Sequence, residues 1–418
     1  MASASTWAVW AAGFGLTACQ ADPCPDGSAC ASANCCDDSA LTGAEFHPPD
    51  EPGPYGASAT TLRWTDARGQ AMVAEVWYPI PLDSSGSPAC APKPYPELPI
   101  AGEACRDADA AAPPDGGFPL IAFSHGNAGI RYQSIFLTEA LAQHGYVVIA
   151  PDHPHNTLID FDDAALGTVA EQRPADIQSA VDRLNAVSTP PLSATTEEGA
   201  LLAGLVQTDR YGMAGHSFGG WTTIAVAGGT INVPGLRAFC ADPANIAIDY
   251  DFCAVLDTLP ETASNADFAG ADPRAVTAMA MAPAGWYAFS PGPVGTAGGL
   301  ADVVPTLLLG GTMDESESIA HEIQPLYDRL TDSTSLHGPD DLGVLEGAGH
   351  YAFTDICQIG NIQPDCDEEA GGYIAIDDAH RIINVLAIAW FGATLYNDAR
   401  FQPYLDNPAW PELTWTAG

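Results

Sequence analysis

Basic residues are scarce in this sequence. Only 13 Lys and Arg stand against 53 Asp and Glu in 418 residues, which gives a formal net charge of −40. A surface this acidic repels polyanions at long range and excludes nucleic acid as a partner. It disfavours anionic substrates and suits neutral or cationic ones, although solubility in a salty or external medium explains the same charge.

The first six residues contain no Lys or Arg, so the basic start of an ordinary export signal is missing. The apolar stretch Trp7–Leu16 is too short to span a bilayer and is still typical of a signal. It leads into Leu16-Thr17-Ala18-Cys19, which resembles the lipobox of bacterial lipoproteins. We therefore expect an export signal over residues 1–18, with Cys19 as the lipidated first residue of a cell-envelope or secreted protein.

The cysteines lack metal-binding spacing, because no C-x-x-C pair is followed by a second and Cys35 and Cys36 are adjacent. The chain has eleven cysteines, and lipidation of Cys19 would leave ten. An even number is what we expect of a protein whose cysteines pair as disulfides in an oxidising compartment. Six of them form pairs that are close in sequence: Cys90 with Cys105, Cys240 with Cys253, and Cys357 with Cys366. We expect these pairs to be disulfides, although spacing alone does not establish the connectivity. His153 and His155 lie in a proline-broken loop without a carboxylate at helical spacing, so we expect no metal.

Residues 19–58 are rich in Cys, Pro and Gly and show no apolar period, which predicts a tether. Residues 59–418 then form one α/β domain. Runs rich in β-branched and aromatic residues at 62–65 and 72–78 predict a hairpin, and residues 81–117 a surface loop. From Phe118 strands alternate with helices, which predicts a mostly parallel central sheet covered by helices on both faces. The expected helices include residues 135–144, 175–187 and 373–395, and the last strand is expected at 343–346.

The chain centres on Gly215-His216-Ser217-Phe218-Gly219-Gly220, a serine between glycines. A buried strand is expected over residues 210–214 and a helix over 221–227, so Ser217 falls on the turn between them. This arrangement predicts a nucleophile elbow, in which a strained backbone lifts the hydroxyl above the strand ends. The Phe218 N–H at the helix start would then help to bind an oxyanion.

A second oxyanion donor is expected after the strand that starts at Phe118. The loop Ser124-His125-Gly126-Asn127 follows it, and Asn127 is the best candidate for a backbone N–H that faces the site. We interpret His125 as a packed structural histidine.

Two further residues complete a catalytic set in the chain order that an α/β-hydrolase requires. Asp314 follows the buried strand expected over residues 305–310 and is the candidate acid, with Glu315 and Glu317 as rivals. His350 follows Gly347-Ala348-Gly349, a loop loose enough to bring the imidazole to Ser217. The histidines at 321, 337 and 380 lack such glycines.

The substrate pocket is less defined by the sequence. Trp286 and Tyr287 either wall an acyl pocket or close the core. The insertion at residues 228–273 has the length and position of a lid, or else is a disulfide-braced surface loop.

Seven segments together resemble the bacterial platelet-activating-factor acetylhydrolase-like and predicted dienelactone hydrolase group of α/β-hydrolases. These segments are Val76–Pro79, Phe123–Gly126, Tyr146–Pro154 with Asn156-Thr157, Arg173–Asp176, Gly215–Gly220, Gly310–Thr312 with Asp314, and Glu346–His350 with Phe353–Asp355. The resemblance implies serine esterase chemistry without a cofactor or metal. The chain departs from dienelactone hydrolases, which use cysteine as nucleophile, and from the acetylhydrolases, whose acid follows the strand that ends here near Ala282.

The sequence thus predicts a carboxylic-ester hydrolase that acts on short-chain acyl esters through Ser217, His350 and Asp314. The expected substrate is a small neutral ester. Whether this ester is part of a lipid or of a polyester is left open. The alternatives are a polyester hydrolase similar to cutinases, or a surface lipoprotein that binds a ligand without catalysis. The oligomeric state is not determined by these patterns.

Overall fold

The computed structural model describes residues 46–96, 100–248, 250–292, 298–332, 340–359, 363–367 and 371–418. The predicted signal, Cys19 and most of the predicted tether lie outside these residues and stay predictions. The compact unit that contains the candidate site begins at His47, and its first strand begins at Gly56. The first strand thus begins three residues before residue 59, where the predicted domain starts, and the division into domains stays a prediction.

A ten-stranded sheet organises the described residues, in the order β10-β9-β8-β7-β6-β4-β5-β2-β1-β3. Neighbours from β5 through β4 and β6 to β9 are parallel, whereas β2 and β10 pair antiparallel with β5 and β9. The carboxyl ends of the central strands therefore meet at one edge. The strands are β1 Gly56–Thr65, β2 Ala71–Ile80, β3 Cys105–Arg106, β4 Phe118–Ser124, β5 Val147–Pro151, β6 Val206–His216, β7 Ala275–Met281, β8 Thr306–Gly311, β9 Asp341–Leu345 and β10 Leu413–Thr416.

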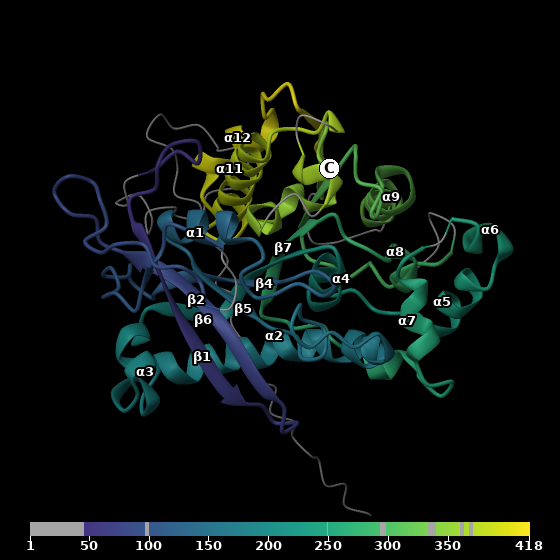
Figure 1. Cartoon of the computed structure of the whole chain (residues 1–418), viewed down its shortest axis with the longest axis horizontal. Helices are drawn as coiled ribbons and strands as arrows, with labels where there is room; N and C mark the ends of the chain where they lie inside the picture. The colour runs from purple at the N-terminus through teal and green to yellow at the C-terminus, as the bar shows by residue number, and fades with distance from the viewer. Residues whose placement is uncertain are drawn as a thin grey trace, which may run out of the picture. The chain divides into compact units, whose positions relative to one another are not determined.

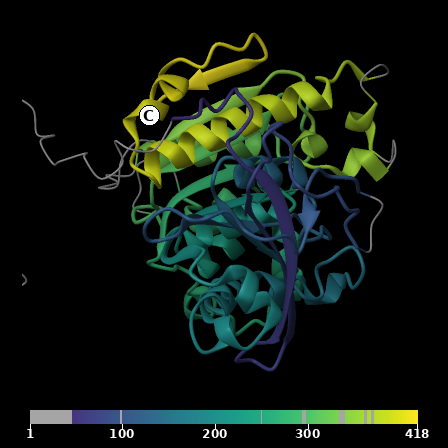
Figure 2. The same ribbon diagram turned by 90° about the vertical axis from the view of Figure 1, so that its left-hand side faces the viewer.

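Helices cover both faces of this sheet. In Figure 1, α1 and α11 lie above the central strands and α2 lies below them. Figure 2 shows from the side how the long helix α11 crosses its face of the sheet. The helices are α1 Ile135–Gln143, α2 Leu166–Ser188, α3 Glu197–Leu202, α4 Phe218–Val226, α5 Val233–Cys240, α6 Pro243–Ile246, α7 Cys253–Thr258, α8 Trp286–Phe289, α9 Gln324–Asp332, α11 Ile376–Thr394 and α12 Pro403–Asp406.

The alternation of side chains along β4 explains why both faces are covered. Ile121 and Phe123 pack into the core beneath α1 and α11, whereas Leu120 and Ala122 pack into the core beneath α2. Every residue of β4 is buried. A strand with apolar side chains on both faces is typical of a central parallel strand, because water reaches neither face. The predicted α/β-hydrolase architecture is confirmed.

Two predicted boundaries were wrong. Helix α2 begins at Leu166, nine residues before the predicted start, and continues through Pro174. Its buried face, which includes Val169 and Ala170, stabilises this first half despite the missing proline N–H. At the other end, β9 is not the last strand, because β10 pairs with it after α12.

Three disulfides join the cysteine couples expected from their spacing: Cys90–Cys105, Cys240–Cys253 and Cys357–Cys366. The first closes the loop that carries β3, and the second closes a loop of the insertion at residues 228–273. Among the described residues, no helix combines the length and apolar character needed to cross a membrane.

Candidate active site

Ser217 lies on a strained turn between β6 and α4, with φ 57° and ψ −122°. An ordinary residue held there costs roughly 1–3 kcal/mol. The flanking glycines permit this turn through close backbone approaches. A Cβ on Gly215 would lie 2.3 Å from the Gly219 carbonyl oxygen, and one on Gly219 would lie 1.9 Å from the Ser124 carbonyl oxygen. The Ser217 N–H donates to the Met281 carbonyl at 2.9 Å, which fixes the turn to β7.

Asp314 and His350 meet at the carboxyl ends of β8 and β9. The His350 Nδ1–H donates to Asp314 Oδ2 at 2.8 Å. Asp314 Oδ1 accepts the backbone N–H groups of Ser316 and Glu317, so the carboxylate is held on both oxygens. This arrangement leaves His350 Nε2 as the ring nitrogen available to a second partner.

One cavity of about 370 Å³ is lined by both Ser217 and His350. The Ser217 hydroxyl forms no hydrogen bond with another residue in the described part of the chain, so it remains available to a ligand. In unliganded sites the contact between a nucleophile and its base is often long and tightens only with substrate. The large aliphatic residues that line this cavity are Ile100, Ile130, Leu158, Ile356 and Ile359.

Two backbone N–H groups adjoin the serine. Phe218 is the first residue of α4, so its N–H has no acceptor within the helix. Asn127 lines the cavity, and its N–H donates to no group among the described residues. The loop lies close to the serine, because a Cβ on Gly126 would lie 3.3 Å from the Ser217 Cβ. The geometry suits a pair of oxyanion donors.

His216 also lines the cavity, and sequence reasoning missed it. Its ring lies 4.6 Å from the His350 ring, and its Nε2–H donates to the His350 carbonyl at 2.9 Å. Its Nδ1 accepts from Gln133 Nε2 at 3.0 Å. Burial, and to a smaller extent the neighbouring His350, holds the pKa of His216 well below its usual range. His216 therefore stays neutral and positions the backbone of His350. Its place beside Ser217 in the glycine-rich turn was the available sequence signal.

A second Ser-His-Asp array lies deeper in the protein. Ser124 Oγ lies 2.9 Å from His153 Nε2, and His153 Nδ1 lies 2.8 Å from Asp176 Oδ2. All three side chains are buried, and none lines the cavity of Ser217. This array has the contacts of a catalytic triad without access for a substrate, so we interpret it as structural.

None of the histidines at 125, 153 and 155 lines the cavity of Ser217. His125 is buried, with Nδ1 donating to the Gly126 carbonyl at 2.8 Å, as expected of a packed histidine. His153 belongs to the buried array, whereas His155 is exposed. Among the described residues no group of three or more His, Cys, Asp or Glu side chains is arranged to hold a metal ion.

The prediction that Trp286 and Tyr287 wall the pocket was wrong. Neither lines the cavity, and both are buried in the core between the sheet and the insertion. The Trp286 ring is covered by the Arg329 guanidinium at 3.7 Å, and the Tyr287 hydroxyl accepts the Phe252 N–H at 3.0 Å. They close the core, the second interpretation that the sequence allowed.

The insertion at residues 228–273 reaches the cavity through Asp251. The next residue, Phe252, packs on the rings of Phe218 and Trp221 in α4. The insertion is therefore part of the core beside the elbow helix. Its role as a lid stays a prediction.

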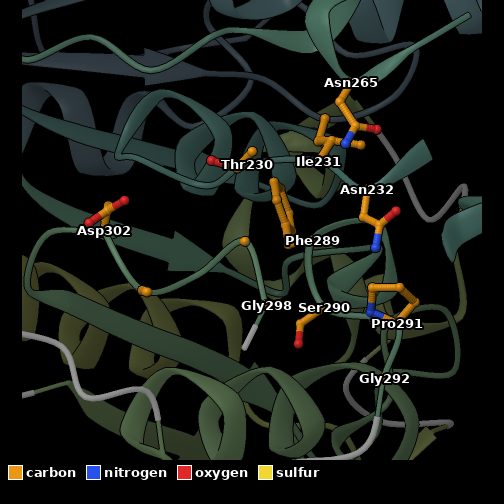
Figure 3. Close-up of a pocket in the computed structure, with 12 residues that line it drawn as sticks. Thr230, Ile231, Asn232, Asn265, Phe289, Ser290, Pro291, Gly292, Gly298 and Asp302 are labelled. Carbon is orange, nitrogen blue, oxygen red and sulfur yellow. The ribbon is translucent and has the colours of Figure 1, made fainter. Parts of the chain in front are cut away.

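Another cavity, of about 490 Å³, lies beside the insertion and is shown in Figure 3. Its two asparagines are already engaged, since Asn232 Oδ1 accepts the Gly235 N–H and Asn265 Oδ1 accepts the Val233 N–H. Neither Ser217 nor His350 lines it. It offers no nucleophile with a base and is not the candidate site.

The mostly parallel sheet, with a strained serine at the β6–α4 turn and a His-Asp pair at the same strand ends, defines an α/β-hydrolase. The family described as platelet-activating factor acetylhydrolase, isoform II, matches residues 101–183. This match supports assignment of the chain to the α/β-hydrolases similar to that acetylhydrolase, and the family indicates a hydrolase that acts on esters. The matched residues include the Asn127 loop but not Ser217, Asp314 or His350. Comparison with curated proteins gives no match.

Proposed function

We propose that this protein is a serine carboxylic-ester hydrolase that cleaves short-chain acyl esters through an acyl-enzyme. The observation that carries the proposal is the 2.8 Å hydrogen bond between His350 Nδ1 and Asp314 Oδ2, with His350 and the strained Ser217 lining one cavity. The pairing fixes the tautomer in which Nε2 can take a proton from a serine hydroxyl.

The mechanism follows from these positions. His350 takes the Ser217 proton as Oγ attacks the ester carbonyl, and Asp314 stabilises the imidazolium that forms. The Phe218 and Asn127 N–H groups hold the oxyanion. The imidazolium then gives its proton to the leaving alcohol, and water releases the acyl group by the same route in reverse.

The cavity supports a neutral substrate of modest size. Five large aliphatic side chains line it. The lining also includes the acidic residues Asp251 and Glu317, and no Lys or Arg that would bind a carboxylate is among the described lining residues. The net charge of −40 also favours a neutral substrate, because it repels anionic ones. Short acyl esters of neutral alcohols fit this chemistry, and the reaction requires no cofactor.

The test uses the full chain with p-nitrophenyl acetate and p-nitrophenyl butyrate. Ser217→Ala is expected to lower kcat by at least about 10³-fold, because the nucleophile is lost while the fold is kept. The exposed Ser85→Ala serves as control and is expected to keep the parental rate. A fluorophosphonate probe is expected to label Ser217 and to leave the buried Ser124 unlabelled, as peptide mapping would show. Parental hydrolysis by Ser217→Ala would rule the mechanism out.

A further inference from the structure

Arg173, in the middle of α2, is a fully buried cation whose hydrogen-bond partners are all uncharged. Its Nε donates to Thr222 Oγ1 at 2.9 Å and its Nη1 to Asn156 Oδ1 at 2.6 Å. Its Nη2 donates to Ser124 Oγ at 3.1 Å and to the His125 carbonyl. All three side-chain nitrogens are therefore used, and the partners come from helix α4, the loop after β5 and the end of β4.

No ion pair of Arg173 is found within the described residues. Asp176, three residues further along the helix, pairs with Arg68 and His153 instead. Burial lowers the pKa of Arg173 to about 9, and the charge of Asp176 opposes this shift. The guanidinium stays charged at neutral pH. A buried charge without a close counter-ion is costly, so a purely structural role would be served better by an apolar side chain.

One set of these contacts holds the loop that carries Asn127. The His125 carbonyl lies two residues before Asn127 and accepts from Nη2. Asn156 bridges Arg173 and Asn127. Its Oδ1 accepts from Arg173 Nη1, and its Nδ2 donates to Asn127 Oδ1 at 2.7 Å. Asn127, whose N–H we assign to the oxyanion, is thus held through the backbone two residues before it and through its own side chain.

The other set holds the start of α4. The Thr222 hydroxyl accepts from Arg173 Nε and donates to the Phe218 carbonyl at 2.9 Å. The guanidinium also lies over the Phe218 ring, with 4.5 Å from its central carbon to the ring centre. The second oxyanion donor is therefore fixed to the same guanidinium as the first.

From this geometry we infer that Arg173 is the positioning residue of the oxyanion hole: one buried guanidinium sets the distance between the Asn127 and Phe218 N–H groups and places a positive charge behind them. The inference rests on the proposed esterase function. Only a planar group with several fixed donors can bind these four acceptors together, which a lysine ammonium cannot do. The consequence is preorganised stabilisation of the oxyanion, with little effect on binding of the uncharged ester.

The experiment compares Arg173→Met and Arg173→Lys with the parental full chain. Arg173→Met is expected to lower kcat for p-nitrophenyl butyrate by about 10²-fold or more, the cost typical of losing an oxyanion donor, with KM changed by less than about threefold. Arg173→Lys keeps the charge but loses the fork and is expected to recover only part of the loss. The affinity for a trifluoromethyl ketone, which forms a tetrahedral adduct with Ser217, is expected to fall in parallel with kcat.

Arg183→Met is the matched control, because it removes the same charge ten residues further along α2 without a contact to the Asn127 loop. It is expected to keep the parental kcat. Should Arg173→Met fail to fold, Thr222→Val and Asn156→Ala each remove one connection, and each is expected to lower kcat by about tenfold at constant KM.

The results separate this inference from the function on which it rests. If the parental chain is inactive, or Ser217→Ala is active, the proposed function fails. If the parental chain is active and Ser217→Ala is not, while folded Arg173→Met or both substitute variants keep the parental kcat and ketone affinity, the assignment of Arg173 is overturned.

Discussion

At the scale of single residues, the candidate site depends on how closely backbone segments approach Ser217. The carbonyl of Ser124 lies where a Cβ of residue 219 would be, so the serine turn and the segment that leads to Asn127 are in direct contact. Glycine is needed at this position because any side chain would push the two segments apart. The same contact places the buried Ser124 beside the site without making it reachable.

Two buried carboxyl groups near the cavity, Glu317 and Glu322, give the fold a specific response to pH. Burial, reinforced by neighbouring carboxylates, raises the pKa of both well above the usual value for glutamate. The folded protein therefore keeps protons that the unfolded chain releases. This contribution to stability is complete below the pKa of the unfolded chain and is lost as pH rises through the folded pKa.

Glu317→Gln should flatten that dependence, because the amide has no proton to lose. We expect the thermal midpoint of the parental chain to fall more between about pH 5 and about pH 8 than that of Glu317→Gln. Glu322 remains in the variant, so part of the slope should persist. The exposed Glu315→Gln is the control and should keep the parental slope. Equal slopes for Glu317→Gln and the parental chain would contradict the assignment.

At the scale of elements, the strand order brings the candidate triad together from the carboxyl ends of three strands of one parallel set. Ser217 follows β6, Asp314 follows β8 and His350 follows β9, while β7 separates the serine from the acid. Because these strands are parallel, their carboxyl ends share one edge. The segment before the histidine loop is further held by Glu412, the residue directly before β10, since the Glu346 N–H donates to the Glu412 carbonyl at 2.7 Å.

Deletion of residues 411–418 tests that support. The deletion removes β10, exposes the edge of β9 and frees the backbone just before the His350 loop. We expect a lower thermal midpoint and a fall in kcat of about tenfold, measured with p-nitrophenyl butyrate. Thr414→Ala, an exposed change within β10, should leave both unchanged. A deletion variant with parental kcat would show that β9 positions His350 by itself.

At the scale of the whole molecule, the charge of −40 should select among substrates of equal size. An anionic ester approaches a repulsive field, whereas a neutral ester does not. Salt screens this field, since the Debye length falls from about 30 Å at 0.01 M to about 3 Å at 1 M.

We therefore expect kcat/KM for p-nitrophenyl hemisuccinate to be well below that for p-nitrophenyl butyrate, a neutral ester with the same number of acyl carbons, at low ionic strength. Added salt should raise kcat/KM for the hemisuccinate and leave kcat/KM for the butyrate nearly constant, so the two values should approach each other. A ratio that does not change with salt would show that selectivity arises from contacts in the cavity instead.

The sequence by itself determined the α/β order, the serine turn, and the aspartate and histidine after their strands. These signals are local, because a glycine-flanked serine or an apolar run carries its conformation in a few neighbouring residues. Tertiary structure alone decided that Trp286 and Tyr287 close the core, that β10 pairs with β9, and that His216 and Arg173 contact the segments of the site. Packing between segments far apart in the chain makes those choices, and no short pattern encodes which distant partner a buried side chain will meet.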